Sequence, residues 1–187
     1  ENKKETGRDL YKDVIERYNH YTELLKQGNR KDLAEEIKQN NIASEEYGMI
    51  FSRMDYQNAP DFKYALLDLN KDGQDELLIG DEKFVSAIYY LENHKPSLLH
   101  TAYVPSAGGF RSGFVIYENG QVVYADWHAT HPEMNLALYS FDKNGVQKVK
   151  EATIQIGGNE KAEQVLDISS EKLDLSNIGW KELNPAN

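Results

Sequence analysis

The stretch YALLDLNKDGQDELLIGD, residues 64 to 81, places a dense acidic turn between two apolar runs. Four carboxylates and one asparagine fall within the nine residues from Asp68 to Glu76. Asp, Asn and Gly favour turns, and the flanking Leu, Ile and Tyr residues suit strands. The pattern therefore predicts two strands joined by a turn. Because crowded like charges repel each other, it also predicts that a cation belongs at this turn.

The spacing of the oxygen donors in this turn indicates which cation. Counted from Asp68 as position one, side-chain oxygens recur at positions one, three, five and nine, and the backbone carbonyl of Gln74 is available at position seven. A short loop wraps Ca²⁺ in this way, because calcium takes about six to eight oxygen ligands. Gly73, at position six, allows the sharp reversal that such a loop needs. Magnesium fits less well, because it requires octahedral geometry and keeps its water ligands.

The turn departs from the calcium loop that joins two helices. That loop carries a bidentate Glu at position twelve, where this chain has Ile79. The D-x-N-x-D-G-x-x-E pattern between strands instead resembles calcium loops of FG-GAP-like blades and of Gram-positive surface lipoproteins and secreted proteins, in which a helical region commonly precedes the hairpin. The resemblance closely covers residues 62–91. It implies that the calcium ligands are Asp68, Asn70, Asp72, Gln74 through its carbonyl, and Glu76. Asp75 is then expected to point to the other face, although an exchange of roles between Asp75 and Glu76 stays open.

The same resemblance implies a location outside the cell. We expect an extracellular or cell-surface protein that is lipid-anchored to the membrane, where millimolar Ca²⁺ keeps even a weak site occupied. The chain begins at Glu1 without a methionine, so we expect a processed product whose signal or lipid-attachment segment lies upstream of residue 1. Cysteine is absent, which excludes disulfides, thiolate catalysis and cysteine-ligated zinc sites.

Length and charge narrow the possible classes of protein further. A chain of 187 residues can bury one core, so a single domain spanning residues 1–187 is expected. The net charge of −10 argues against a nucleic-acid partner, because phosphate binding requires clustered Lys and Arg. No stretch reaches the roughly 20 apolar residues of a membrane helix, so no transmembrane segment is expected in this chain.

The N-terminal part of the chain, about residues 8–55, has a helical pattern. Apolar residues at spacings of four, four, three and four predict a first helix with one buried face, and they are Leu10, Val14, Tyr18, Tyr21 and Leu25. Gly28 stops this helix, and Asn29 precedes a second one. A third helix is expected to begin at Ser44, with Glu45 and Glu46 in its first turn, where the helix dipole favours anions.

After Pro60 the pattern changes to that of strands. Short runs rich in Val, Ile, Tyr and Phe, separated by turn residues, predict eight strands at 62–69, 76–80, 84–92, 97–104, 112–118, 121–128, 135–142 and 146–156. Asn119-Gly120 and the segment from Asp142 to Gly145 indicate hairpin turns. The β-rich part is about 61–156, and a mixed tail, 157–187, contains a short helix at 161–166. The fold class is α+β, with N-terminal helices packed on a mainly antiparallel, meander-like sheet.

A second constellation, in ADWHATHPE, combines Asp126, His128, His131 and Glu133. Asp126 and His128 project from the same face of a strand, and imidazole with carboxylate suits zinc or another transition metal. The helical His-x-x-x-His spacing of metalloproteases is missing, so the alternative is a polar surface. The glycine-rich stretch SAGGFRSGF, residues 106–114, matches no phosphate loop, because no Lys-Ser or Lys-Thr pair follows it.

These patterns favour a calcium-binding, non-enzymatic extracellular module of a bacterial cell-surface protein, with calcium in a mainly structural role. Its partner is an unknown molecule outside the cell or in the cell envelope. We expect the surface that meets it around the glycine-rich stretch and the aromatic strand segment YADWH, residues 124–128. One alternative is a transition-metal-dependent hydrolase that uses Asp126, His128 and His131. Another is a sensor that changes conformation when it binds calcium.

Overall fold

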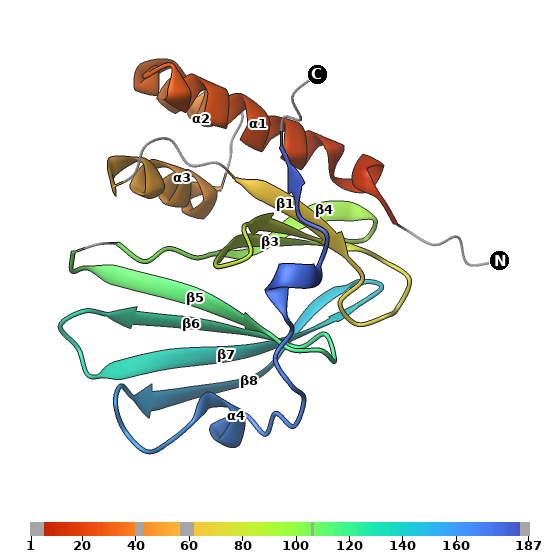
Figure 1. Ribbon diagram of the computed structural model, residues 1–187, viewed down its shortest axis with the longest axis vertical. Helices are drawn as coiled ribbons and strands as arrows, with labels where there is room; N and C mark the ends of the chain where they lie inside the picture. The colour runs from red at the N-terminus through yellow and green to blue at the C-terminus, as the bar shows by residue number, and fades with distance from the viewer. Residues whose placement is uncertain (1–5, 40–42, 57–61, 106, 184–187) are drawn as a thin grey trace.

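The protein is built in three layers, which are a group of helices, a five-stranded sheet and a four-stranded sheet (Figure 1). The computed structural model describes residues 6–39, 43–56, 62–105 and 107–183. Pro60, after which the strand pattern begins, and Ser106, the first residue of the glycine-rich stretch, lie outside these ranges. The predicted α+β class is confirmed, because the helices come first and every strand pairing is antiparallel.

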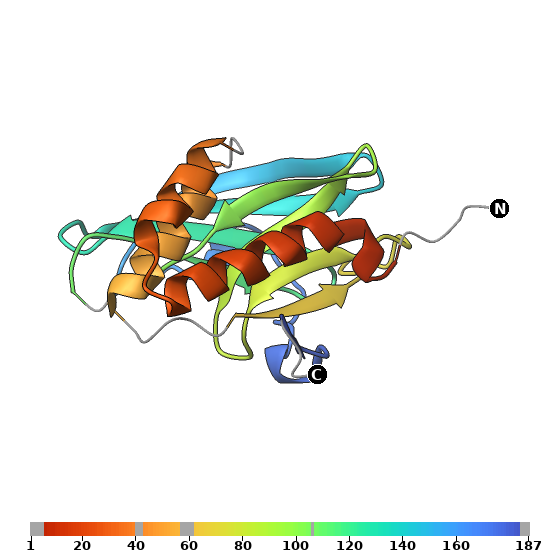
Figure 2. The ribbon, with the colours of Figure 1, turned by 90° about the horizontal axis from the view of Figure 1, so that it is seen from above.

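The three predicted N-terminal helices are present. A 3₁₀ turn, η1 (Arg8–Tyr11), leads into α1 (Lys12–Lys26), and α2 (Arg30–Gln39) and α3 (Ser44–Tyr56) follow. Four of the five residues in the predicted stripe of α1 are buried, namely Val14, Tyr18, Tyr21 and Leu25. Figure 2 shows α1 lying over the strands of the five-stranded sheet, so this stripe fills the core between helix and sheet.

The five-stranded sheet lies in the middle layer. It contains β1 (Lys63–Leu67), β2 (Glu76–Gly80), β3 (Val85–Glu92), β4 (Lys95–Thr101) and β9 (Lys181–Glu182), in the order β4-β3-β2-β1-β9. All residues of β2 are buried, because Leu77 and Ile79 face the helices while Leu78 faces the other sheet. Burial on both faces explains why this strand is an uninterrupted apolar run.

The four-stranded sheet forms the third layer. Its strands follow chain order, with β5 (Phe110–Ile116), β6 (Val122–His128), β7 (Glu133–Asp142) and β8 (Gly145–Gln155). The eight predicted strands and both predicted hairpins are confirmed. The sequence pattern predicts one meander, whereas the chain divides the strands into two sheets after β4. The helices cover only one face of the first sheet, so its other apolar face requires the second sheet.

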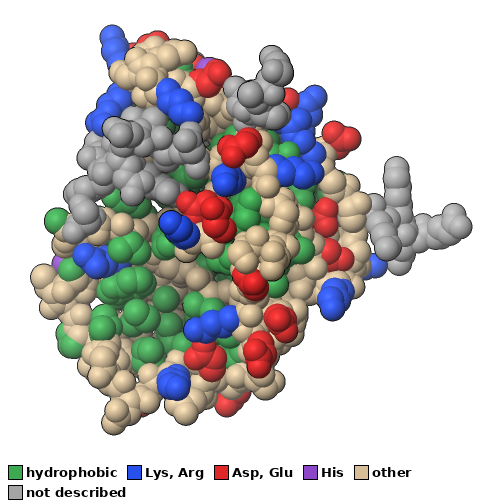
Figure 3. All heavy atoms as spheres, viewed as in Figure 1, with side chains coloured by type: hydrophobic (Ala, Val, Ile, Leu, Met, Phe, Trp, Pro, Cys, Tyr) green, Lys and Arg blue, Asp and Glu red, His purple; other side chains and the backbone are tan. Residues whose placement is uncertain are grey.

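The C-terminal tail crosses from the second sheet to the first. The predicted short helix is α4 (Ala162–Val165), and Leu166 and Ile168 after it pack on the outer face of the four-stranded sheet. The tail continues through η2 (Leu175–Asn177) and ends in β9, which pairs with β1. Figure 3 shows hydrophobic side chains gathered over the four-stranded sheet beside this tail. No helix among the described residues is long and apolar enough to cross a membrane.

Candidate functional site

The acidic turn joins β1 to β2, as the sequence predicts. Leu67 pairs with Glu76, so residues 68–75 form a closed loop at one end of the five-stranded sheet. Lys71 and Gly73 have φ angles of 59° and 93°. Glycine adopts such angles without strain, so Gly73 stands at a position where the chain must reverse.

Acidic side chains in the loop hold its backbone in place. The carboxylate of Asp68 accepts hydrogen bonds from the N–H groups of Asp72, at 3.1 Å, and Gly73, at 2.9 Å. Oδ1 of Asp72 accepts one from the N–H of Gln74, also at 2.9 Å. The loop therefore curls around two of its own carboxylates, as an Asx-rich turn does.

Contacts with the second sheet fix the position of the loop. The side-chain amide of Asn70 donates to the backbone oxygen of Phe141 at 2.7 Å, and that of Gln74 donates to the backbone oxygen of Lys143 at 3.3 Å. Gly120, in the β5–β6 turn, lies against the backbone of Asn70. The loop is thus held between two hairpins of the other sheet.

Glu76 and Asp75 point in different directions. Glu76 is 3% exposed, and its Oε2 accepts a hydrogen bond from the N–H of Leu69 at 2.9 Å, across the loop. Burial, together with the nearby charges of Asp72, Asp68 and Asp75, raises the pKa of Glu76 to about 8. Asp75 instead accepts a hydrogen bond from the N–H of Gly7 at 2.8 Å and so anchors the N-terminal segment. Of the two carboxylates, Glu76 is therefore the one directed into the loop.

The ligand atoms that the loop offers are of the kind that calcium binds. The predicted ligands, Asp68, Asn70, Asp72, Gln74 and Glu76, all offer oxygen, and a carboxylate oxygen that accepts one hydrogen bond keeps a second lone pair. Among the described residues, however, no three Asp, Glu, His or Cys side chains are grouped closely enough to hold a metal ion. Calcium would therefore have to draw the carboxylates of the loop closer together.

The second predicted constellation lies at the β6–β7 turn, and its members contact separate partners. Nδ1 of His128 lies 2.8 Å from Oγ1 of Thr130, and Asp126 accepts a hydrogen bond from the side chain of Asn135 at 3.1 Å. The rings of His128 and His131 meet at a centroid distance of 5.1 Å. The structure thus brings the two imidazoles together, but no metal-binding group that includes them is found among the described residues.

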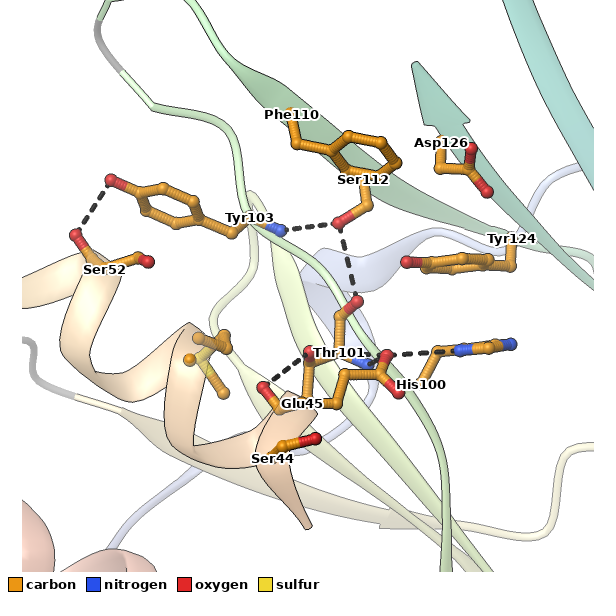
Figure 4. Close-up of a pocket in the computed structure, with 12 residues that line it drawn as sticks. Ser44, Glu45, Ser52, His100, Thr101, Tyr103, Phe110, Ser112, Tyr124 and Asp126 are labelled. Atoms are coloured by element: carbon orange, nitrogen blue, oxygen red, sulfur yellow. Dashed lines mark hydrogen bonds and ion pairs between the residues drawn. The ribbon is translucent and has the colours of Figure 1, made fainter. Parts of the chain in front are cut away.

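A pocket of about 580 Å³ lies between α3, the end of β4 and strands β5 and β6 (Figure 4). Its lining includes Glu45, Met49, His100, Ser112, Tyr124 and Asp126. Ser112, Tyr124 and Asp126 come from the glycine-rich stretch and the aromatic strand segment, where the sequence predicts a partner surface. Glu45 and His100 were not predicted, because they lie 55 residues apart on a helix and a strand and share no spacing pattern.

Glu45 and His100 form the centre of a polar network in this pocket. Oε1 of Glu45 lies 3.1 Å from Nδ1 of His100 and accepts a hydrogen bond from the N–H of Thr101 at 2.8 Å. Burial alone would raise the pKa of Glu45, but the hydrogen bonds from His100 and Thr101 lower it overall. The ring of His100 stacks on Tyr124 at 4.0 Å, and its Nε2 lies 2.9 Å from the hydroxyl of Tyr139. The network joins the helix to both sheets.

Comparison of the chain with protein-family models, with curated proteins and with solved structures finds no match in any of the three. The acidic loop and the pocket are therefore the features from which function can be inferred.

Proposed function

We propose that this chain is a calcium-binding, non-enzymatic module of a bacterial cell-surface protein, in which the ion has a mainly structural role. The observation that supports this proposal is the uncompensated charge of the acidic loop. Asp68 and Asp72 lie in one turn with Glu76, whose pKa their charges help to raise, and among the described residues no Lys or Arg forms an ion pair with any of the three. A divalent cation would offset their mutual repulsion.

The position of the loop favours a structural role for the ion. Asn70 and Gln74 tie the loop to the second sheet, and Asp75 ties it to the N-terminal segment. Calcium bound by the neighbouring carboxylates would hold these connections in one arrangement. For a dissociation constant of about 10 μM and about 1 mM free Ca²⁺, binding to the folded state adds roughly 2.7 kcal/mol of stability.

The cell-surface location in this proposal rests on the resemblance of the loop to those of Gram-positive surface lipoproteins. Outside the cell, calcium is abundant enough to occupy a site of modest affinity. A lipid anchor attached upstream of residue 1 and an unknown partner in the cell envelope belong to the same proposal.

Calorimetric titration of the chelator-treated protein with CaCl₂ tests the calcium proposal directly. We expect one site with a dissociation constant of about 10⁻⁵ to 10⁻³ M, as for other extracellular calcium modules. Titration with MgCl₂ serves as the matched control and should give weaker binding, because the loop offers flexible carboxylates and not a fixed octahedron. Absence of any saturable calcium binding at millimolar concentration would contradict the proposal.

A further inference from the structure

The pocket lies at the opposite end of the strands from the acidic loop. The loop follows Leu67 at the end of β1, and the adjoining β3–β4 turn is at the same end of the sheet. Thr101, which lines the pocket, is at the far end of β4. None of the predicted calcium ligands lines the pocket, so calcium binding does not account for the pocket.

We propose that this pocket binds a small organic cation that carries an ammonium group. Its volume of about 580 Å³ is within the range of small-molecule sites, which is roughly 300–1,000 Å³. This inference is independent of calcium binding, because the two sites share no residues.

The charges of the lining favour a cation. Two carboxylates, Glu45 and Asp126, line the pocket, and the lining residues that the structure describes include no Lys or Arg. The N-terminus of α3 also opens on the pocket, but Glu45 stands in its first turn and opposes its attraction for anions. Glu45 is already bonded to His100 and Thr101. Asp126 is therefore the carboxylate that an ammonium group would meet, and it would repel an anionic ligand.

Aromatic rings beside Asp126 provide a second kind of contact for an ammonium group. Ser112 pairs with Asp126 across β5 and β6, which places Phe110 and Tyr124 on the same face of the sheet as that carboxylate. Figure 4 shows Phe110, Asp126 and Tyr124 grouped along one wall. Phe110 is 66% exposed, so its ring is available at the rim. Ammonium groups bind to the faces of such rings, most strongly where water is excluded.

Hydrogen bonds join this wall to Tyr103 and to α3 before any ligand binds. The N–H of Ser112 donates to the backbone oxygen of Tyr103 at 2.9 Å, and the hydroxyl of Ser112 accepts from the N–H of Tyr103 at 3.1 Å. The hydroxyl of Tyr103 donates to the backbone oxygen of Ser52 on α3 at 2.8 Å. These bonds lock the corner between the two sheets onto the helix, so little ordering is needed when a ligand binds.

Titration with choline, followed by calorimetry and by the amide NMR signals of Thr101 and Ser112, tests the proposal on the intact chain. We expect saturable binding of choline and shifts of those two signals. The uncharged carbon isostere, dimethylbutanol, should bind at least about tenfold more weakly, because it fills the same volume without the charge. Equal binding of the two compounds, or binding of glucose but not of choline, would overturn the proposal.

Two variants in the pocket and one control variant outside it locate the site. Asp126→Asn keeps the size of the side chain and removes the charge, so choline binding should weaken by about tenfold. Glu151→Gln makes the same chemical change on β8, outside the pocket, and should leave binding unchanged. Phe110→Ala removes an exposed ring, so it should weaken binding without affecting folding. If Asp126→Asn and Glu151→Gln bound choline equally well, the proposed site would be wrong.

Discussion

Gly120 and Asn70 approach each other so closely that a Cβ atom on Gly120 would lie 2.6 Å from the Cα of Asn70. Gly120 belongs to the turn between β5 and β6, whereas Asn70 belongs to the acidic loop between β1 and β2. The two sheets thus meet through backbone at this point. Gly120 also has a φ of 88°, an angle that side-chain-bearing residues rarely adopt.

Gly120→Ala should therefore lower the free energy of unfolding by about 2–4 kcal/mol, since it combines backbone strain with overpacking. Gly157→Ala is the matched control, because Gly157 has a φ of 75° but no atom within 4 Å of the point that a Cβ would occupy. That variant should lose only about 1–2 kcal/mol. Urea unfolding curves of the two variants measure the difference, and equal losses would show that the close approach contributes nothing.

Asp72 and Asp75 should respond differently to substitution by alanine. Asp72→Ala removes a predicted calcium ligand, so the rise in melting temperature on adding CaCl₂ should disappear. Asp75→Ala removes the bond to Gly7 and lowers the melting temperature itself, but it should leave most of the calcium-dependent rise. Thermal unfolding with chelator and with calcium separates the two effects. If both variants kept the rise, the assignment of the loop positions would be wrong.

Stability of the calcium-free protein should depend on the pH through Glu76. Its pKa in the folded protein, about 8, is above its ordinary value of 4.5. The contribution of protonated Glu76 to the free energy of unfolding is therefore complete below about pH 4.5 and is lost as the pH rises through 8. The loss is on the order of a few kcal/mol. Glu76→Gln mimics the protonated acid and should flatten this dependence in chelator. The Glu76→Gln curve is subtracted from the wild-type curve to remove the contribution of other titrating groups. If the wild type were then as stable at pH 8 as at pH 5, the role assigned to Glu76 would be wrong.

Local patterns in the sequence predict most of the secondary structure. The stripe of α1 and the eight strand runs each depend on neighbouring residues, and so do the turns at Asn119-Gly120 and Asp142–Gly145. The division into two sheets depends instead on the corner where Ser112 bonds to Tyr103, and no periodicity marks that corner. The acidic loop was recognisable because all its donors lie within nine residues.

The pocket network was only half predictable, for a related reason. The stretches that contain Ser112 and Asp126 stand out by composition, so a surface could be expected there. Glu45 has the pattern of an ordinary first-turn acid, and His100 that of one polar residue in a strand. Only the packing of α3 against the end of β4 brings the two within 3.1 Å. Contacts of this kind depend on tertiary structure and leave no spacing in the sequence.

The imidazoles of His128 and His131 distinguish the calcium module from the hydrolase. In a non-enzymatic module they are surface groups, so replacing both with Ala should change the free energy of unfolding by no more than about 0.5 kcal/mol. The hydrogen bond of His128 to Thr130 lies on the surface and should add little. Elemental analysis should find the same metal content in the wild type and the double variant. In a transition-metal hydrolase the double variant would lose its metal, because a site without two of its imidazoles cannot complete four-coordination. Stoichiometric zinc that is present in the wild type and absent from the variant would therefore favour the hydrolase over the calcium module.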